Sequence, residues 1–241
     1  MSSIFIEKEV KSLKEIQRSQ IHIIRKNHRL FKYCDDACFK SKNLYNRANF
    51  IIREQFEKDN TIIFSNELNK NLKTEDCFKA LPAKTSQQII INLGYNWKSF
   101  FRSVKRWGRN KKNYTGRPKF PNYKNKNGRN LVTVDYMQGK FKDGKYYFPV
   151  RKGGDRESYI ETNIQKKDFV LLRIIPCGNC YKIAIVYRKQ AEERLTNENY
   201  LAIDLGINNL ATLINNAGLR PVAINGRILK SINCYYNKLY A

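Results

Sequence analysis

Residues 201–213, LAIDLGINNLATL, carry the most information about the fold. They read as two apolar strands joined by a tight turn of glycine and asparagine, with a single carboxylate, Asp204, at the centre of the first strand. An acid inside an apolar strand is costly to bury unless a metal ion or a basic group lies against it. The stretch therefore predicts a hairpin that presents Asp204 to a positive partner.

The net charge is the unusual feature of the composition. The 241 residues are enough for one or two domains, and they hold 46 basic against 21 acidic side chains, a formal charge of +25. Such an excess attracts polyanions, which makes nucleic acid the expected partner. A membrane partner is disfavoured because the chain has no long apolar span and no concentrated basic amphipathic tail. We expect no small-molecule substrate.

Targeting and cysteine usage point to a reducing compartment. The first fifteen residues, MSSIFIEKEVKSLKE, lack the apolar core of a signal peptide. The six cysteines are irregularly spaced and do not resemble a disulfide framework. We therefore expect a cytoplasmic protein, associated with the nucleoid if DNA is its partner.

One long segment of the chain is free of acids. Residues 77–134 contain fourteen Lys or Arg and no Asp or Glu. Apolar residues at three- and four-residue steps predict a helix over about 85–107, with Thr85 or Ser86 as N-cap. Five cations fall on one face of it, beside the apolar stripe: Lys98, Arg102, Lys105, Arg106 and Arg109.

A basic loop follows this helix. Residues 114–128 are rich in Gly, Pro and Lys, and cations alternate with aromatic side chains up to Lys124. Cations suit phosphates and aromatic faces suit unstacked bases, so the mixture favours RNA or strand-separated DNA. The candidate contacts in the loop are Arg117, Lys119, Tyr123 and Lys124. The alternative is a merely solvated charged face. Trp97, Phe100 and Trp107 have helical spacing and are expected in the core.

The remaining pattern alternates between helix and strand periods. We expect a short strand over 20–25, a helical region over about 30–59, antiparallel strands between 131 and 188, a linker over 190–199 and a helix over 228–240. Cys177 and Cys180 have the spacing of half a zinc ribbon, but the chain offers no matching second pair. Gly178 and Asn179 between two strand runs favour a hairpin turn instead.

Several stretches in the same order resemble one family. They are HRLFKYCDDACFKSKNLYNRANFIIR, LPAKTSQQIIINLGYNWKSFF, GRPKFPNYK, AIDLGINNLATL and INGRILKSINCYYNK. Together they resemble the OrfB/TnpB proteins of insertion sequences, which are transposon-associated RNA-guided DNA endonucleases related to type V CRISPR effectors. The resemblance runs nearly end to end and is more specific than any single motif.

The resemblance implies a fold and a set of partners. It implies an α+β multidomain protein, with an oligonucleotide-binding-like β wedge domain over 1–28 and 114–189 and an inserted helical lobe over 29–113. An RNase H-like (RuvC) α/β domain would begin at 190–241. Guide RNA and target DNA would be the partners, in transposition and DNA recombination. Asp204 would be the first catalytic, Mg²⁺-binding carboxylate, and Arg227 and Lys230 would contact nucleic acid within a family segment that includes Asn225, Gly226 and Ser231.

The chain departs from the family after Asp204. No Asp or Glu follows that residue, whereas the family continues with a Glu motif, a four-cysteine zinc ribbon and a final Asp motif. Mg²⁺ would therefore serve a complete nuclease, and zinc would belong to the missing C-terminal part. We expect the chain as it stands to be incomplete, or inactive in cleavage by itself.

Two other functions remain open. The chain could be a non-cleaving regulator or remnant that binds RNA and DNA. The sequence Ile203-Asp204-Leu205-Gly206 also opens the first phosphate motif of actin- and chaperone-type ATPases. That alternative is weaker because Ile207-Asn208-Asn209-Leu210 lacks the Thr or Ser expected at the phosphate turn.

Overall fold

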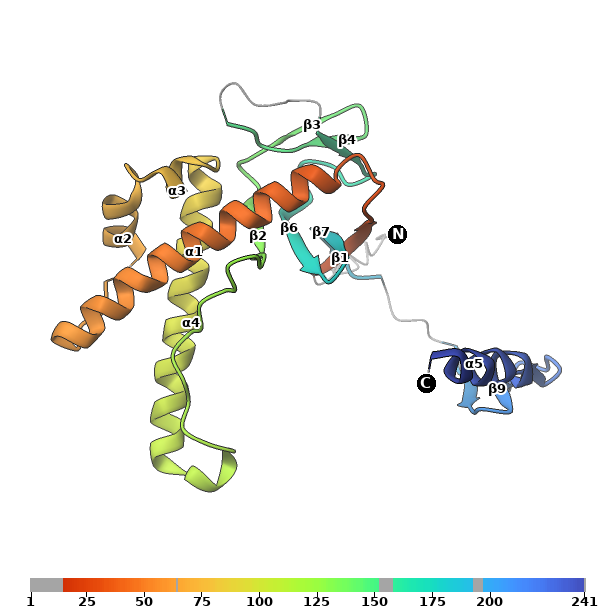
Figure 1. The fold of residues 1–241 in the computed structure, drawn as a ribbon. Helices are drawn as coiled ribbons and strands as arrows, with labels where there is room; N and C mark the ends of the chain where they lie inside the picture. The colour runs from red at the N-terminus through yellow and green to blue at the C-terminus, as the bar shows by residue number, and fades with distance from the viewer. Residues whose placement is uncertain (1–14, 64, 152–157, 193–196, 241) are drawn as a thin grey trace, which may run out of the picture. The chain divides into compact units, whose positions relative to one another are not determined.

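A computed structural model of the chain describes residues 15–63, 65–151, 158–192 and 197–240. They form two compact units that divide between Ala191 and Glu192 (Figure 1). Both units contain antiparallel sheets and helices, so the predicted α+β class is confirmed. The first fourteen residues, which the sequence analysis assigns to a wedge domain, lie outside the described residues.

The first unit contains two antiparallel sheets. The larger has the strand order β1-β7-β6-β2, formed by β1 (Glu15–Ile24), β2 (Val132–Asp135), β6 (Phe169–Cys177) and β7 (Cys180–Gln190). The smaller has the order β3-β4-β5, formed by β3 (Lys140–Lys142), β4 (Lys145–Tyr147) and β5 (Tyr159–Glu161). The segment after β5 returns the chain to β6, and β1 is added at the edge of β7 in antiparallel register.

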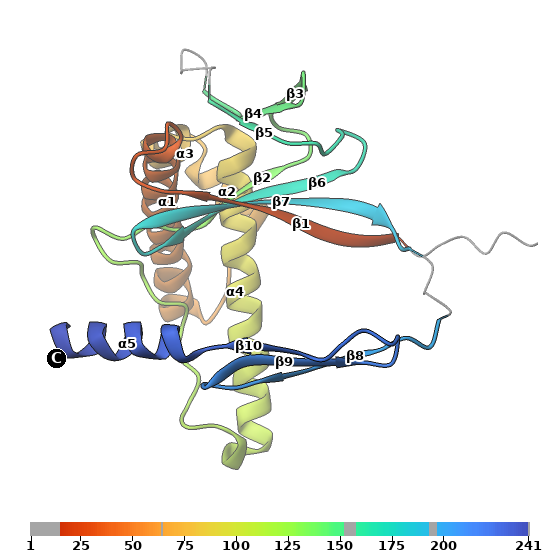
Figure 2. The same cartoon turned by 90° about the vertical axis from the view of Figure 1, so that its right-hand side faces the viewer.

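Two long helices pack on the larger sheet of the first unit. They are α1 (Phe31–Asp59) and α4 (Ala83–Arg109), which pack against each other, with the short helices α2 (Ser65–Leu72) and α3 (Asp76–Lys79) beside them (Figure 2). A 3₁₀ turn at Lys111–Asn113 follows α4. Helix α4 also packs on β2, so one continuous core joins helices and sheet.

The core follows from the two hydrophobic periods. Leu44, Ala48 and Ile52 recur at four-residue steps on α1 and are fully buried, as are Ile89, Leu93 and Trp97 on α4. Alternate residues Ile183 and Ile185 of β7 point into the same core. No helix among the described residues is long and apolar enough to cross a membrane.

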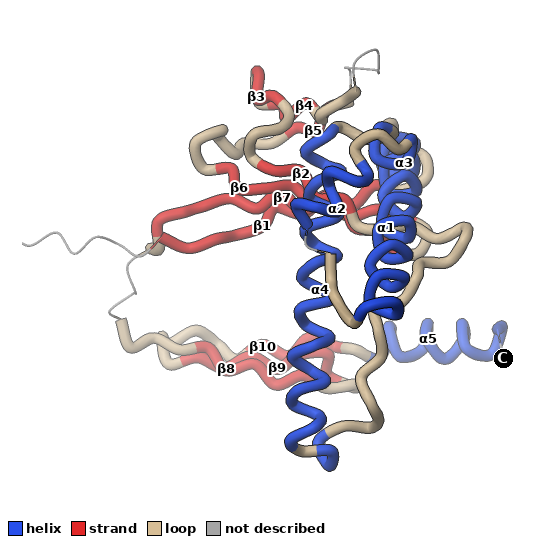
Figure 3. The backbone as a smooth tube through the Cα atoms, turned by 90° about the vertical axis from the view of Figure 1, so that its left-hand side faces the viewer, coloured by secondary structure: helices blue, strands red, loops and turns tan. Residues whose placement is uncertain are grey.

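The second unit is a small sheet and one helix. Its strands have the order β10-β9-β8 and are β8 (Leu201–Leu205), β9 (Asn209–Asn215) and β10 (Val222–Asn225) (Figure 3). Helix α5 (Arg227–Tyr240) follows directly. The predicted hairpin that carries Asp204 is confirmed as β8 and β9, with Asp204 opposite Thr212.

The predicted start of α4 needs correction, and two short helices need to be added to the predicted elements. Helix α4 begins at Ala83 after Pro82, so Thr85 and Ser86 lie in its first turn and neither is the N-cap. Their hydroxyls bond elsewhere: Thr85 to the side chain of Gln138, and Ser86 to the carbonyl of Phe78. Helices α2 and α3 were not predicted, because each is too short for a clear period.

The hairpin between β6 and β7 is confirmed. Cys177 lies opposite Cys180 in the register of the two strands, and Gly178 adopts a positive φ of 55° in the turn. The thiol of Cys180 donates to the carbonyl of Cys177 at 3.3 Å. The Cys-x-x-Cys spacing is therefore that of a two-residue β-turn.

Candidate nucleic-acid interface

The basic stripe of α4 lies where its spacing predicts. We call Lys98, Arg102, Lys105, Arg106 and Arg109 the basic stripe; all five are exposed, whereas Ile89, Leu93 and Trp97 of the same helix are buried in the core. Among the described residues none of the five forms an ion pair with a carboxylate. The stripe therefore presents uncompensated positive charge to solvent.

An aromatic cluster holds the basic loop against the helices. Phe120 packs on Trp97 at 5.4 Å, on Phe100 at 4.9 Å and on Phe56 at 5.7 Å between ring centroids. The expectation that the loop's aromatic rings are free for bases is therefore wrong for Phe120, because burial beside Trp97 gains more than exposure would. Tyr123 fits that expectation, since it is 42% exposed.

The three aromatic residues predicted to be core on α4 differ in depth. Trp97 is 1% exposed, and its indole Nε1–H donates to the side-chain oxygen of Asn49 at 3.0 Å. Phe100 is partly buried against the core. Trp107 is only partly covered, with the ammonium of Lys111 5.1 Å and the guanidinium of Arg117 6.0 Å from its ring centroid. The core assignment of Trp107 is wrong because α4 extends beyond the body against which Trp97 packs.

A row of polar side chains on α1 clamps the segment 121–131 in place. Asn46 makes two 2.8 Å hydrogen bonds with the backbone of Lys124, one as donor and one as acceptor. The amide of Asn49 donates to the carbonyl of Pro121 at 2.9 Å, and the ammonium of Lys42 donates to that of Lys126 at 2.7 Å. The segment therefore runs antiparallel to α1, and its backbone is fixed.

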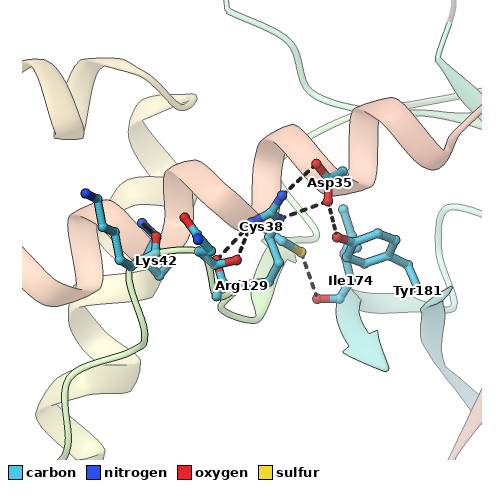
Figure 4. A network of polar contacts seen from close by, with 9 residues as sticks. Asp35, Cys38, Lys42, Arg129, Ile174 and Tyr181 are labelled. Atoms are coloured by element: carbon cyan, nitrogen blue, oxygen red, sulfur yellow. Dashed lines mark hydrogen bonds and ion pairs between the residues drawn. The ribbon is translucent and has the colours of Figure 1, made fainter. Parts of the chain in front are cut away.

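Asp35 anchors the far end of this clamp (Figure 4). Its carboxylate accepts two 2.8 Å hydrogen bonds from the guanidinium of Arg129 and one of 2.5 Å from the hydroxyl of Tyr181 on β7. The hydrogen bond from Arg129 lowers the pKa of Asp35 most, and the bond from Tyr181 adds to it. Burial and the bond to Asp35 raise the pKa of Tyr181, so helix, loop and sheet meet at one ionised group.

Of the four loop candidates, Tyr123 and Lys124 lie in the clamped segment, and Arg117 and Lys119 precede it. Arg117, Lys119 and Lys124 are exposed. The guanidinium of Arg53 lies 4.4 Å from the ring centroid of Tyr123, and the ammonium of Lys124 lies 5.1 Å from that of Tyr45. These cation–π contacts orient two candidates within the protein. Their contact with nucleic acid stays a prediction.

Asp204 lies in an open sheet rather than a buried one. Every residue of β8 is exposed, including Ile203 at 54% and Leu205 at 77%. Asp204 therefore does not incur the cost of a buried carboxylate among the described residues. The strand alternation places Asp204 and Ala202 on the face opposite Leu201, Ile203 and Leu205.

The turn after β8 is tied to the start of α5. The ammonium of Lys230 donates to the side-chain oxygen of Asn208 at 3.1 Å, and the backbone N–H of Gly226 donates to the carbonyl of Asn208 at 2.9 Å. A Cβ at Gly226 would lie 2.7 Å from the carbonyl oxygen of Ile207, so only glycine fits. Asn225 accepts from the backbone N–H of Arg227, and the side chain of Arg227 is exposed.

The described residues do not provide a divalent cation site. No group of three or more His, Cys, Asp or Glu among them is arranged to hold a metal ion. Mg²⁺ keeps most of its waters unless several oxygen ligands converge, and Asp204 supplies one carboxylate. The Mg²⁺ role of Asp204 stays a prediction for a complete nuclease.

Sequence reasoning missed the polar clamp of α1. Its side chains are those of Asp35, Ser41, Lys42, Asn46, Asn49 and Arg53. The available signal was a row of polar residues at three-, four- and seven-residue steps beside the apolar stripe of a long helix. That row indicated a second packing surface, although it did not reveal what packs there.

Comparisons with known proteins give limited matches. No family model and no curated protein matches the sequence. A solved structure of a Cas12f1–sgRNA–target DNA complex is 14% identical, with a TM-score of 0.34 over 90% of this chain and 59% of that one. A CRISPR-Cas12f ternary complex is 11% identical, with a TM-score of 0.35 over 85% of this chain and 50% of that one. The chain thus spans between half and three fifths of these proteins, and TM-scores this low do not establish a shared fold.

Proposed function

We propose that this chain binds RNA and DNA as the N-terminal part of an RNA-guided DNA endonuclease of the OrfB/TnpB kind. The observation that carries the binding is the acid-free segment 77–134. Within this segment the basic stripe of α4 lies at the surface. Polar side chains of α1 fix the backbone of the cationic loop that follows. A pre-ordered cationic surface loses little conformational entropy when it meets phosphates.

The nuclease class in this proposal comes from the sequence resemblance. The five segments quoted above lie on α1, on α4, in the basic loop, on the hairpin of β8 and β9, and on β10 and α5. In a complete protein Asp204 would contribute to a Mg²⁺ site, and the wedge and RuvC-like domains would be those of that family. The described residues alone do not bring together the several ligands that a catalytic Mg²⁺ site needs.

A second candidate function is binding without cleavage. It is favoured because no group of three or more metal-ligating side chains forms around Asp204 in the described part of the chain. Both candidates share the nucleic-acid surface, and they differ only in whether a full-length natural product cuts DNA. A cleavage assay on that product distinguishes them.

The binding proposal is tested by salt titration. The probe is a fluorescein-labelled RNA stem–loop with blunt ends, bound to the full chain at several KCl concentrations. Replacing Lys98, Arg102, Lys105 and Arg109 by Gln should lower the affinity and flatten the log–log salt slope by about 3, since each neutralised phosphate contributes about 0.7–0.9. The helix should persist, because these residues lie off its buried stripe.

A matched control removes the same charge elsewhere. Replacing the exposed Lys142, Lys166, Lys167 and Lys182 by Gln should leave most of the slope intact. If both quadruple variants flatten the slope equally, the RNA is held by net charge alone and the basic stripe is a solvated face. If the wild-type chain does not bind the RNA, the proposed function is wrong.

A further inference from the structure

A second cationic surface lies in the first unit, away from the basic stripe. A cavity of about 430 Å³ opens between the start of α1, the connection from α3 to α4 and the segment after β4. An adjoining cavity of about 410 Å³ shares four of its lining residues, Leu81, Pro82, Val150 and Arg151. The two cavities form one groove, which we call the ridge groove because the partly exposed Pro82 and Val150 form an apolar ridge along it, whereas Leu81 is buried.

The ridge groove is strongly basic. It is lined by six cations and one carboxylate: Arg29, Lys32, Lys40, Lys73, Lys79, Arg151 and Asp36. The carboxylate of Asp36 is already paired with the ammonium of Lys40 at 2.6 Å. Among the described residues, Lys32, Lys79 and Arg151 are exposed and have no ion pair. An anionic ligand would therefore meet cations on both sides of the ridge.

Arg29 is held ready on one wall. Its guanidinium stacks on the ring of Tyr159, 3.8 Å from the centroid, and donates to the carbonyl of Tyr159 at 2.8 Å. A planar guanidinium fixed in this way retains further N–H donors for a phosphate. Arg29 lies in the turn before α1, and Tyr159 lies on β5. The position of Arg29 therefore depends on the tertiary fold.

The apolar ridge narrows the choice of ligand. A bare anion would gain nothing from the partly exposed Pro82 and Val150, whereas an unstacked base or a sugar can cover them. A duplex keeps its bases stacked inside and offers its backbone, so it would leave the ridge uncovered. The volume of each cavity lies within the range of pockets that bind small ligands. A single nucleotide fits a pocket of that volume.

We propose that the ridge groove binds an unpaired nucleic-acid strand, with bases on Pro82 and Val150 and phosphates on Arg29, Lys32, Lys79 and Arg151. This inference rests on the proposed function, because it names a second contact surface for the same class of ligand. It also predicts that unpaired and stem–loop RNA depend on different residues of one chain. The basic stripe takes the structured part and the ridge groove takes the unpaired part.

The first test compares two triple variants of the full chain. The probe is a fluorescein-labelled twelve-nucleotide oligouridylate, which has no stable secondary structure. Lys32→Gln, Lys79→Gln and Arg151→Gln together should lower its affinity about tenfold and flatten the salt slope by about 2. The control, Lys142→Gln, Lys166→Gln and Lys167→Gln, should change both much less. A melting curve for each variant verifies that it is folded.

The second test locates the strand directly. The same oligouridylate with 4-thiouridine, irradiated on the wild-type chain, should cross-link to peptides that contain Leu81 and Pro82 or Val150. A duplex of equal length should compete weakly for this cross-link, and oligoglutamate of equal charge should compete weakly as well. Strong competition by the duplex or by oligoglutamate, or cross-links confined to other peptides, would overturn the inference.

The outcomes separate the two proposals. If the ridge-groove variant binds oligouridylate like its control while the basic-stripe variant loses stem–loop RNA, the groove inference is wrong and the proposed function stands. If only the ridge-groove variant loses its ligand, the groove inference stands and the basic stripe is not the carrier. If the wild-type chain binds neither RNA, both proposals are wrong.

Discussion

At the scale of single residues, Asp35 connects helix, loop and sheet through one carboxylate. Its bonds to Arg129 and Tyr181 require the ionised form, which is why its pKa is lowered. A group whose pKa is lower in the folded state stabilises the fold above its unfolded pKa. That stabilisation is lost as the pH falls through the folded value.

Asp35→Asn should lower the free energy of unfolding by about 1 kcal/mol at pH 7, a figure reduced because the carboxylate is partly exposed to solvent. The difference from wild type should shrink only below about pH 4, near the unfolded pKa of Asp. Urea unfolding followed by tryptophan fluorescence measures it, since Trp97 and Trp107 both lie on α4. Asp36→Asn, at an exposed pair with Lys40, is the control and should have little effect. A difference that persists unchanged into acid would contradict the ion-pair explanation.

Asp204 is open to solvent, and its replacement should therefore be mild. Asp204→Ala should change the stability of the second unit by no more than about 0.5 kcal/mol and leave RNA binding unchanged. Hydrogen–deuterium exchange over residues 201–215 is the measurement. Gly226→Ala is the positive control and should speed exchange there, because its Cβ would meet the carbonyl of Ile207. A loss of about 3–5 kcal/mol in Asp204→Ala would instead indicate a paired, buried carboxylate.

At the scale of elements, α1 has two working faces. One buries apolar residues in the core, and the other fixes the loop after α4 by side-chain bonds to its backbone. Asn49 serves both, because it is fully buried, donates to Pro121 and accepts from Trp97. A single amide thus links α1, α4 and the basic loop.

Asn49→Ala should lower the free energy of unfolding by about 2–4 kcal/mol, because it leaves the indole N–H of Trp97 and the carbonyl of Pro121 without this partner. Asn46→Ala removes two bonds to Lys124 at an exposed position and should cost about 1 kcal/mol, since water replaces them. Urea unfolding of both variants gives the comparison. Equal losses would show that burial of the amide does not decide its contribution.

At the scale of the whole molecule, charge and chemistry lie in different parts of the chain. The acid-free segment and the ridge groove belong to the first unit, and Asp204 belongs to the second. The two surfaces proposed to bind nucleic acid in the first unit therefore do not include Asp204. Cleavage would require carboxylates that the described residues do not bring together.

The purified chain should not cut DNA, with or without RNA, in the presence of Mg²⁺. Hydrolysis of a phosphodiester by two metal ions needs several carboxylates around cations about 4 Å apart, and one Asp does not hold them. The assay is nicking of supercoiled plasmid, with Asp204→Ala and chelator as controls. Guide-dependent cutting that both controls abolish would contradict the prediction.

Much of the secondary structure could be predicted from the sequence because its signals are local. The apolar period of α1 and α4, the alternation in β6 and β7, and the hairpin around Asp204 each repeat within a short window. The exposed basic stripe follows from the same period. Short elements such as α2 and α3 lack that repetition, and the start of α4 depends on partners of Thr85 and Ser86 that the sequence does not identify.

The sequence by itself determined the α+β class, the positions of the long elements, the acid-free segment and the hairpin that carries Asp204. Only the tertiary structure decided that Phe120 packs on Trp97, that α1 clamps the loop, and that residues near 30, 80 and 150 line one groove. The physical reason is range. Periodicity is written along neighbouring residues, whereas a hydrogen bond or a cavity between distant segments exists only once packing brings them together.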